Sequence, residues 1–326
     1  SAVAHYTKLL QSEIGFWKFC QYKFYSQWKK LKKYANKKDI KIIGDIPLYM
    51  ALDSADVWAH GELFELDERK KPIHVAGVPP DCFSEDGQLW GNPIYNWKKM
   101  EHTGFAWWYQ RMRSNANLYD VIRIDHFIGI VNYWSIPADS QTAINGKWKK
   151  GPGKKLTKVI KKATKGASII AEDLGVVGDN VRALIQKTGW PGMKILLFAF
   201  DDENGANEYL PHNYASENCI VYGGTHDNDT IVGYYKEKSD EEIKFVKQYL
   251  GISKKEELPR AMIRCGYASI AKTAVFQMQD ILALDNSARM NCPSTVGTNW
   301  KWRMLPNQFT ADHIRFLKKM CRLYNR

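Results

Sequence analysis

The sequence predicts an α/β fold of the (β/α)8 TIM barrel type. Two observations indicate this fold: short apolar runs alternate with segments of helical periodicity, and three of the runs end in an acid. Strands separated by helices form parallel βα units, and a ring of such units carries functional side chains at the carboxyl ends of its strands. The three acids are Asp125, Glu172 and Asp227, so we expect them to point into one cleft suited to glycosidic-bond chemistry.

The first half of the chain opens with an amphipathic helix. Residues 16–35 carry aromatic side chains at helical spacing, and we expect this aromatic stripe to lie in the core. A buried strand at residues 40–46 follows and ends in Asp45 and Pro47, and a helix at 105–117 precedes a strand at 119–125. Residues 50–117 are rich in Gly, Pro and Trp, which predicts functional loops or a small inserted subdomain.

The second half repeats the alternation of strands and helices. We predict strands at residues 167–173, 193–200 and 218–225, and a helix from Asp179, its cap, to Thr188. Further helices are expected at residues 240–250, 257–272 and 310–324. The whole chain, 1–326, is therefore predicted to be one catalytic barrel domain that contains the 50–117 insertion.

Composition excludes several classes of protein. A chain of 326 residues that is 44% hydrophobic buries a large core, which excludes a disordered protein. No run approaches 18 apolar residues and the start lacks a signal-peptide pattern, so we expect a soluble protein without a membrane partner. The cysteines form no CxxC pair and no regular pattern, which predicts reduced, mostly packed thiols and a cytoplasmic location; they are Cys20, Cys82, Cys219, Cys265, Cys292 and Cys321.

The net charge of +12 raises the question of a nucleic-acid partner. Much of the excess comes from lysines near the start and in a Gly-rich loop, and no helix-turn-helix, zinc-finger or RNP pattern accompanies them. We therefore expect solvated lysine surfaces and no nucleic-acid partner. The loop lysines are Lys147, Lys149, Lys150, Lys154 and Lys155.

The acids fit the two roles of a retaining glycosidase, which places its carboxyl groups about 5 to 5.5 Å apart. Asp125 suits the nucleophile, because Arg123 leaves the same face of the strand and keeps the carboxylate ionised. Glu172 suits the acid/base, because the end of a buried strand raises its pKa. Asp227 suits a contact to sugar hydroxyls beside His226, and flat aromatic faces such as Trp90 and Trp58 suit sugar rings.

Each motif also has a structural explanation. Arg123 and Asp125 alone are more typical of an ion pair, Glu172 of a cap, and the acids around Asn228 of a turn. Metal ligation by His126 or His226 lacks the usual His-containing spacings, and no phosphate-binding loop or dinucleotide fingerprint is present. We expect neither a metal nor a cofactor.

Eight motifs, taken together with their order and their residues, carry more information than any one of them. They are GDIPLY (44–49), ADVWAHGELFELDE (55–68), GVPPDCFSEDGQLWGNPIYNW (77–97), RIDHF (123–127), NGKWKKGPG (145–153), EDLG (172–175), GGTHDNDT (223–230) and ARMNCPSTVGTNWKWR (288–303). Together they resemble the 4-α-glucanotransferase family, also called amylomaltase, disproportionating enzyme or glycoside hydrolase family 77. The resemblance covers nearly the whole chain.

The resemblance implies a retaining barrel of the α-amylase clan that moves an α-1,4-glucan segment onto the 4-hydroxyl of glucose or a maltooligosaccharide. It implies Asp125 as nucleophile, Glu172 as acid/base and Asp227 as stabiliser of the transition state. The Trp90 loop resembles the family's lid over the acceptor side. The substrate-binding residues implied are Asp45, Arg123, His126, His226, Trp90, Asn92 and Pro93.

The chain departs from the family pattern at its start, just before the strand that resembles the third of the barrel. We expect the barrel to lack its first two strand–helix units, and the chain alone to be weakly active or inactive unless a companion N-terminal segment supplies them. A smaller departure is the basic stretch 151–155, where the family often has acids. The alternatives to a transferase are a truncated barrel that only binds glucan and an α-amylase-like hydrolase.

Overall fold

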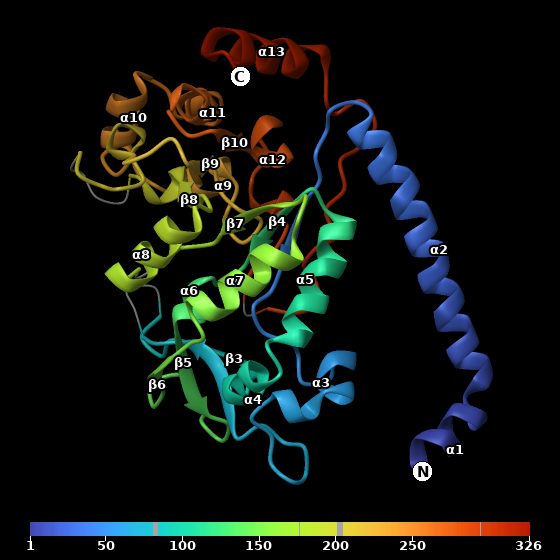
Figure 1. The fold of residues 1–326 in the computed structure, drawn as a ribbon. Coiled ribbons are helices and arrows are strands. Elements are labelled where there is room, and N and C mark those ends of the chain that lie inside the picture. Colours follow the sequence, from blue (N-terminus) through green and yellow to red (C-terminus); the bar gives the residue numbers. More distant parts are fainter. Residues whose placement is uncertain (81–83, 176, 201–204, 294) are drawn as a thin grey trace. The chain divides into compact units, whose positions relative to one another are not determined.

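The fold is that of a computed structural model, which describes residues 1–80, 84–175, 177–200, 205–293 and 295–326 (Figure 1). Cys82 lies outside the described residues. The chain divides into two compact units, unit 1 (Ser1–Thr188) and unit 2 (Gly189–Arg326), and each is described by itself. No helix among the described residues is long and apolar enough to cross a membrane.

The described residues of unit 1 form two sheets with different connectivity. Three parallel strands lie in the order β1-β4-β7, and four antiparallel strands lie in the order β3-β2-β5-β6. The strands are β1 (Ile43–Ile46), β2 (His74–Val78), β3 (Gln88–Pro93), β4 (Val121–Ile124), β5 (Asn132–Pro137), β6 (Lys147–Lys150) and β7 (Ser168–Ala171). The helices are α1 (Ala2–Leu9), α2 (Gln11–Asn36), α3 (Ala55–Ala59), η1 (Gly61–Leu63), α4 (Trp97–His102), α5 (Ala106–Leu118), α6 (Ile128–Val131), α7 (Lys154–Ala163) and α8 (Asp179–Thr188).

The parallel sheet of unit 1 is a buried βα arrangement. Ile122 and Ile124 of β4 are fully buried, and helices α5 and α7 pack against each other beside the sheet (Figure 1). Gly44 is required in β1, because a Cβ there would lie 2.1 Å from the Tyr119 ring. The GDIP glycine therefore lets β1 pair closely with β4.

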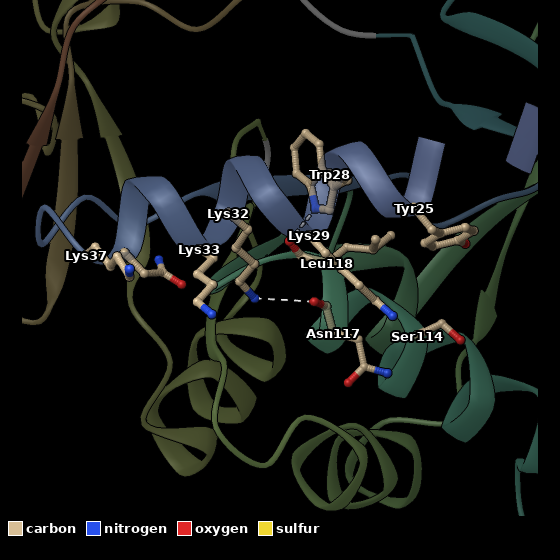
Figure 2. Close-up of a pocket in the computed structure, with 10 residues that line it drawn as sticks. Tyr25, Trp28, Lys29, Lys32, Lys33, Lys37, Ser114, Asn117 and Leu118 are labelled. Carbon is tan, nitrogen blue, oxygen red and sulfur yellow. Dashed lines mark hydrogen bonds between the residues drawn. The ribbon is translucent and has the colours of Figure 1, made fainter. Parts of the chain in front are cut away.

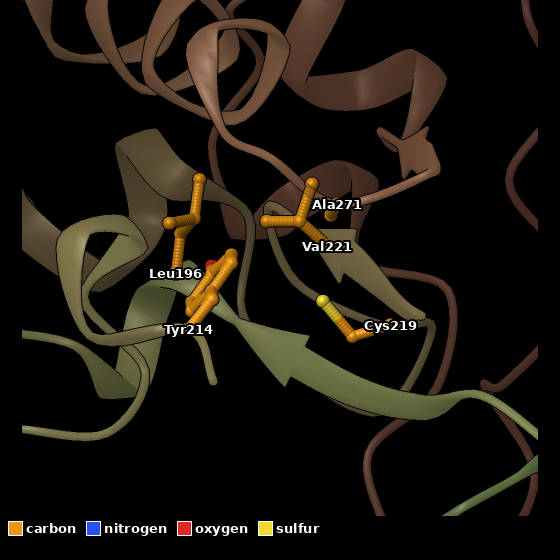
Figure 3. Packing of buried hydrophobic residues seen from close by; sticks show 5 residues of the cluster. All are labelled: Leu196, Tyr214, Cys219, Val221 and Ala271. Atoms are coloured by element: carbon orange, nitrogen blue, oxygen red, sulfur yellow. The ribbon is translucent and has the colours of Figure 1, made fainter. Parts of the chain in front are cut away.

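Unit 2 has a three-stranded parallel sheet in the order β10-β9-β8. Its elements are β8 (Gly192–Ile195), η2 (Leu196–Phe198), η3 (Pro211–Asn213), β9 (Cys219–Tyr222), α9 (Ile231–Lys236), α10 (Lys244–Leu250), η4 (Lys255–Glu257), α11 (Leu258–Ala268), β10 (Thr273–Val275), α12 (Met278–Ile281), η5 (Asn286–Ala288) and α13 (Ala311–Tyr324). A cluster of buried side chains includes two from β9; its members are Leu196, Tyr214, Cys219, Val221 and Ala271 (Figure 3).

The α/β fold is confirmed, while closure of a barrel stays a prediction. The described strands form open sheets, and β1 and β7 are the edges of the parallel sheet in unit 1. The 50–117 insertion also stays a prediction, but its strands β2 and β3 share a sheet with β5 and β6, which lie outside that range. The assignment of residues 1–326 to one catalytic domain likewise stays a prediction.

The prediction that the aromatic stripe of the first helix lies in the core is wrong. Helix α2 forms as expected, yet none of its residues is buried. Phe16, Phe19 and Phe24 are each more than half exposed, because no described element covers that face of the helix. Periodicity identified the helix but not what packs against it.

The interpretation of the second lysine cluster as a Gly-rich loop is also wrong. Lys147 and Lys149 lie in β6, and Lys154 opens helix α7. Leu156 and Ile160 of this helix are fully buried, so the lysines occupy the solvent face of an amphipathic helix. The expectation of a solvated lysine surface fits this arrangement.

Candidate active site

The carboxyl ends of the parallel strands in unit 1 bring four predicted site residues together. Asp45 of β1 is directly opposite Arg123 of β4, and Ile124 of β4 is opposite Ala171 of β7. Asp125 and Glu172 directly follow these last two residues. The sheet register therefore sets Asp45, Arg123, Asp125 and Glu172 at one edge.

Arg123 links the two aspartates. Its guanidinium lies 2.6 Å from the Asp45 carboxylate and 3.0 Å from the Asp125 carboxylate, and its side chain is only 8% exposed. Burial alone would lower the pKa of Arg123, but the carboxylates of Asp45 and Asp125 outweigh burial and raise it. The guanidinium stays charged and holds both aspartates at fixed positions.

Glu172 occupies a different environment from Asp125. It is 7% exposed and its carboxylate accepts hydrogen bonds from the backbone N–H of His126 at 2.6 Å and of Leu174 at 2.8 Å. Burial, reinforced by the negative charge of Asp125, raises the pKa of Glu172 to about 7, although Arg123 and the two N–H donors oppose the shift. Near neutral pH this group both gives and accepts a proton.

Asp125 lies in a more open environment than Glu172. Its side chain is 43% exposed and contacts the Arg123 guanidinium, while its backbone N–H donates to the carbonyl of Ile46 at 3.0 Å. The two neighbouring carboxyl groups thus have different environments: Glu172 is enclosed, and Asp125 is partly exposed beside a guanidinium.

His126, Trp90 and Tyr49 form an aromatic wall next to these acids. The His126 ring meets Trp90 edge-on at 4.7 Å and lies 6.3 Å from Tyr49. Burial of the ring lowers the pKa of His126 to about 4, so it is neutral at physiological pH. His126 also has a φ of 50°, a conformation that non-glycine residues seldom adopt and that often marks functional sites.

The segment that holds Trp90 is strand β3 rather than a loop. Trp90, Asn92 and Pro93 belong to β3, which pairs with β2. Asn92 is half-buried and Pro93 is buried, whereas Trp58 on α3 is 79% exposed. The structure therefore groups Trp90 with His126, and the lid function assigned to its segment stays a prediction.

Two supporting residues were missed from the sequence. Arg111 of α5 donates to the carbonyls of Pro47 at 2.5 Å and Leu48 at 3.3 Å, and Tyr95 donates to Leu48 at 2.7 Å. These bonds fix the turn after β1. The ring of Tyr49 in that turn is buried, and among the described residues its hydroxyl has no hydrogen-bond partner. The predicted site acids, Asp45, Asp125, Glu172 and Asp227, were found from the sequence by their positions at strand ends.

In unit 2, His226 and Asp227 lie in the turn after β9. The side chain of Asn228 accepts from the backbone N–H of Thr225 at 2.8 Å, which closes the turn. His226 Nε2 lies 3.3 Å from Asp227 Oδ2, and the ring of Trp300 lies 5.1 Å from the His226 ring. His226 and Asp227 are therefore together, and their roles stay predictions.

A separate pocket of about 680 Å³ lies between α2 and α5 in unit 1 (Figure 2). It is next to the start of β4, so it is at the opposite end of that strand from Asp125. Lys32 donates to the carbonyls of Asn117 at 3.3 Å and Tyr119 at 3.0 Å. Cations at a helix C-terminus offset its partial negative charge, so Lys32 in this pocket has a structural explanation.

No metal cluster accompanies the acids in the part of the chain that the structure describes: no group of three or more His, Cys, Asp or Glu side chains there is arranged to hold an ion. The described cysteines are free thiols, and Cys292 is exposed rather than packed. The described residues at the strand ends supply carboxyl groups, a fixed guanidinium and aromatic faces.

The motifs agree with comparisons to known proteins. Residues 1–308 match the profile of glycoside hydrolase family 77, described as 4-alpha-glucanotransferase. The chain belongs to this family. It is 48% identical to the 4-alpha-glucanotransferase of Clostridium butyricum, over 99% of the chain and 66% of that relative, and 47% identical to that of Thermus thermophilus, over 95% and 63%.

The similarity to family 77 includes the fold. The amylomaltase from Streptococcus agalactiae, solved in complex with acarbose, superposes with a TM-score of 0.95 at 44% identity and covers 100% of this chain and 66% of its own. The resemblance inferred from the eight motifs is thus confirmed. The chain spans about two thirds of the length of the family 77 relatives it matches.

Proposed function

We propose that this chain carries the catalytic groups of a retaining 4-α-glucanotransferase that acts on α-1,4-glucans and maltooligosaccharides, with glucose-type acceptors. One observation carries the proposal: Asp125 and Glu172 follow neighbouring parallel strands, and burial raises the pKa of Glu172 to about 7. Family 77 membership and the acarbose complex of the Streptococcus agalactiae relative support the choice of substrate.

In the proposed reaction the Asp125 carboxylate attacks the anomeric carbon while the Glu172 carboxyl group donates its proton to the departing 4-oxygen. The bond to that oxygen breaks and an ester to Asp125 forms. Glu172, now a carboxylate, takes the proton of the acceptor's 4-hydroxyl, whose oxygen attacks the same carbon and releases Asp125. Asp227 stabilises the positive charge of each transition state, and both acids return to their starting forms.

The remaining residues have proposed binding roles. Asp45, Arg123, His126 and His226 contact the reacting sugar, and Trp90 with Asn92 and Pro93 line the acceptor side. We further propose that the parallel strands belong to a (β/α)8 barrel of the α-amylase clan, and that the protein acts in the cytoplasm without a metal or cofactor.

Maltotriose distinguishes the proposal from its alternatives. A transferase releases glucose and lengthens other chains at a constant number of reducing ends, whereas a hydrolase increases that number steadily. Glu172→Gln should lower transfer by about 100- to 10,000-fold, the usual contribution of a general acid–base, and Asp125→Asn should abolish the covalent intermediate. Heat of maltoheptaose binding without product would favour a barrel that only binds glucan.

We also propose that a companion segment with further strand–helix units of the same fold binds to the exposed face of α2 and to the outer edge of β1. Phe16, Phe19 and Tyr22 are 59%, 55% and 67% exposed, an unusual density of aromatic surface on one helix. Among the described strands β1 is the outer strand of its sheet, and an edge strand can pair with another strand. The family 77 relatives are longer than this chain by about a third of their length.

Complementation tests this second proposal. The part of the Clostridium butyricum relative that the chain does not span is mixed with the purified chain, and glucose release from maltotriose and co-elution are measured. We expect a complex and a gain in activity of at least about tenfold, both weakened by Phe16→Ser, Phe19→Ser and Tyr22→Ser together. Full activity of the chain by itself, or no complex at micromolar concentrations, would refute the proposal.

A further inference from the structure

The segment after η5 lies along the turn that carries Asp227, entirely within unit 2. Asn291 Nδ2 donates to Asp227 Oδ1 at 2.6 Å, and the backbone N–H of Asn291 donates to the carbonyl of His226 at 3.1 Å. Asn291 belongs to the motif ARMNCPST, which has no role in the function proposed above. One residue thus contacts both the side chain and the backbone of the turn.

Arg289 holds Asn291 and the turn together. Its guanidinium donates to the carbonyl of Asp227 at 2.7 Å and forms an ion pair with Asp229. Its Nε donates to the carbonyl of Asn291 at 2.9 Å. Arg289 therefore bridges residues on both sides of the Asn291–Asp227 hydrogen bond.

Two further contacts anchor the far end of the turn. Asn286 accepts from the backbone N–H of Thr230 at 3.1 Å, and Asp280 accepts from that of Ile231 at 2.7 Å. The turn between β9 and α9 is thus held along its length by residues 280–291. A turn with this many fixed backbone groups keeps a side chain in one orientation.

The type of donor at Asp227 suits an acid that stabilises positive charge. A primary amide orients a carboxylate by hydrogen bonding and adds no positive charge, so the negative charge stays available to the substrate. The other carboxylate oxygen lies 3.3 Å from His226 Nε2. The two neighbours together define both the rotation and the tilt of the carboxylate.

We propose that Asn291 is a positioning residue for Asp227 and that Arg289 fixes Asn291 in place. The inference rests on the proposed role of Asp227 and assigns a part of the reaction to the ARMNCPST motif. A carboxylate displaced by about 1 Å from a developing charge costs about 100-fold in rate. Loss of Asn291 should therefore lower kcat far more than it changes KM.

The test compares Asn291→Ala, Asn291→Asp and Arg289→Lys with Asn299→Ala, measured with the companion segment present if transfer requires it. Asn299 hydrogen-bonds to Cys292 and Thr295 in the same loop and is a control for loosening that loop. We expect kcat on maltotriose to fall about 100-fold in Asn291→Ala with KM within about threefold, and to be unchanged in Asn299→Ala.

Asn291→Asp gives a signature that a merely structural role would not produce. At neutral pH the introduced carboxylate repels Asp227, and in acid its protonated form donates a hydrogen bond as the amide does. Activity relative to the native chain should therefore recover as pH falls. A kcat within threefold of native in Asn291→Ala, or a pH profile of Asn291→Asp parallel to the native one, would overturn the proposal.

A second measurement is independent of activity. The carboxyl ¹³C resonance of Asp227 should titrate at higher pH in Asn291→Ala than in the native chain, because the charged form loses a donor. If the native chain has no transfer activity under any condition, the proposed function fails, while this titration still decides the role of Asn291. An unchanged titration would refute it.

Discussion

Glu172 and Asp125 acquire different properties although both are carboxyl groups at strand ends. Glu172 is enclosed and accepts two backbone hydrogen bonds, and Asp125 is partly exposed beside a guanidinium. The position of the acids was evident from the sequence, because a strand end is a local feature. The sequence predicted only that Glu172 would be the more buried of the two acids. How far their exposures differ depends on side chains that other elements pack against them.

The raised pKa of Glu172 predicts a pH-dependent stability. A group whose pKa is about 7 in the folded chain and 4.5 when unfolded gives stability that is present below pH 4.5 and is lost as pH rises towards 7. Over this pH range we expect the unfolding free energy of the native chain to fall by up to roughly 3 kcal/mol. Glu172→Gln lacks the titrating group and should not show this loss. Urea unfolding at pH 4.5 and pH 8 measures it.

The difference in pH dependence between the native chain and Glu172→Gln isolates the contribution of Glu172. Asp280 is also buried, and burial raises its pKa to about 7, but it titrates in both proteins and cancels. Equal pH dependence of native and Glu172→Gln chains would show that the Glu172 carboxyl group is solvated.

The contacts of Asn291 and Arg289 with Asp227 could not be predicted from the sequence, because the partners are more than 60 residues apart.

Helix α2 contacts the rest of unit 1 through its C-terminal half. Trp28 donates from its indole to the carbonyl of Leu118 at 2.9 Å and meets Tyr119 edge-on at 5.9 Å. Lys32 adds an ion pair to Asp120 at 3.4 Å. Phe19, in the same helix, makes none of these contacts and is 55% exposed.

Trp28→Ala should therefore detach α2, whereas Phe19→Ala should not. We expect Trp28→Ala to cost about 2 kcal/mol and to speed hydrogen exchange of α2 amides by about tenfold or more. Phe19→Ala should change stability by no more than about 0.5 kcal/mol. Equal exchange rates in the two variants would mean that Trp28 does not anchor the helix.

The elements that the sequence predicted best were those with strong local patterns. The cores of β1, β4, β7, β9, α5 and α8 all lie within the expected ranges or within a residue of them. The antiparallel sheet of β2, β3, β5 and β6 was missed, because its segments are rich in Gly, Pro and Trp and lack clear alternation. Helix α7 was missed because its lysines and preceding glycines resembled a loop, although Leu156 and Ile160 have helical spacing.

Over the whole molecule, the largest difference from expectation is the amount of aromatic surface. Helices α1 and α2 have no buried residue among them. Family 77 membership was evident from the motif order, but the exposed face was not, since a sequence pattern gives the apolar side of a helix and not its partner.

This surface predicts that the purified chain binds the dye ANS strongly. Replacing Phe16, Phe19 and Tyr22 together with Ser should reduce ANS fluorescence severalfold. The melting temperature should shift by only a few degrees, because exposed side chains contribute little to stability. Unchanged fluorescence would place the dye-binding surface elsewhere.

The pairing of Asp45 with Arg123 has a consequence for how the chain folds. A slip of one residue between β1 and β4 turns alternate side chains to the opposite face of the sheet. Arg123 would then lose Asp45 and leave a buried guanidinium short of counter-charge, a costly state. The charges that hold the Asp125 carboxylate therefore also penalise misalignment, so a chain with the wrong strand register loses stability and the proposed catalytic geometry together.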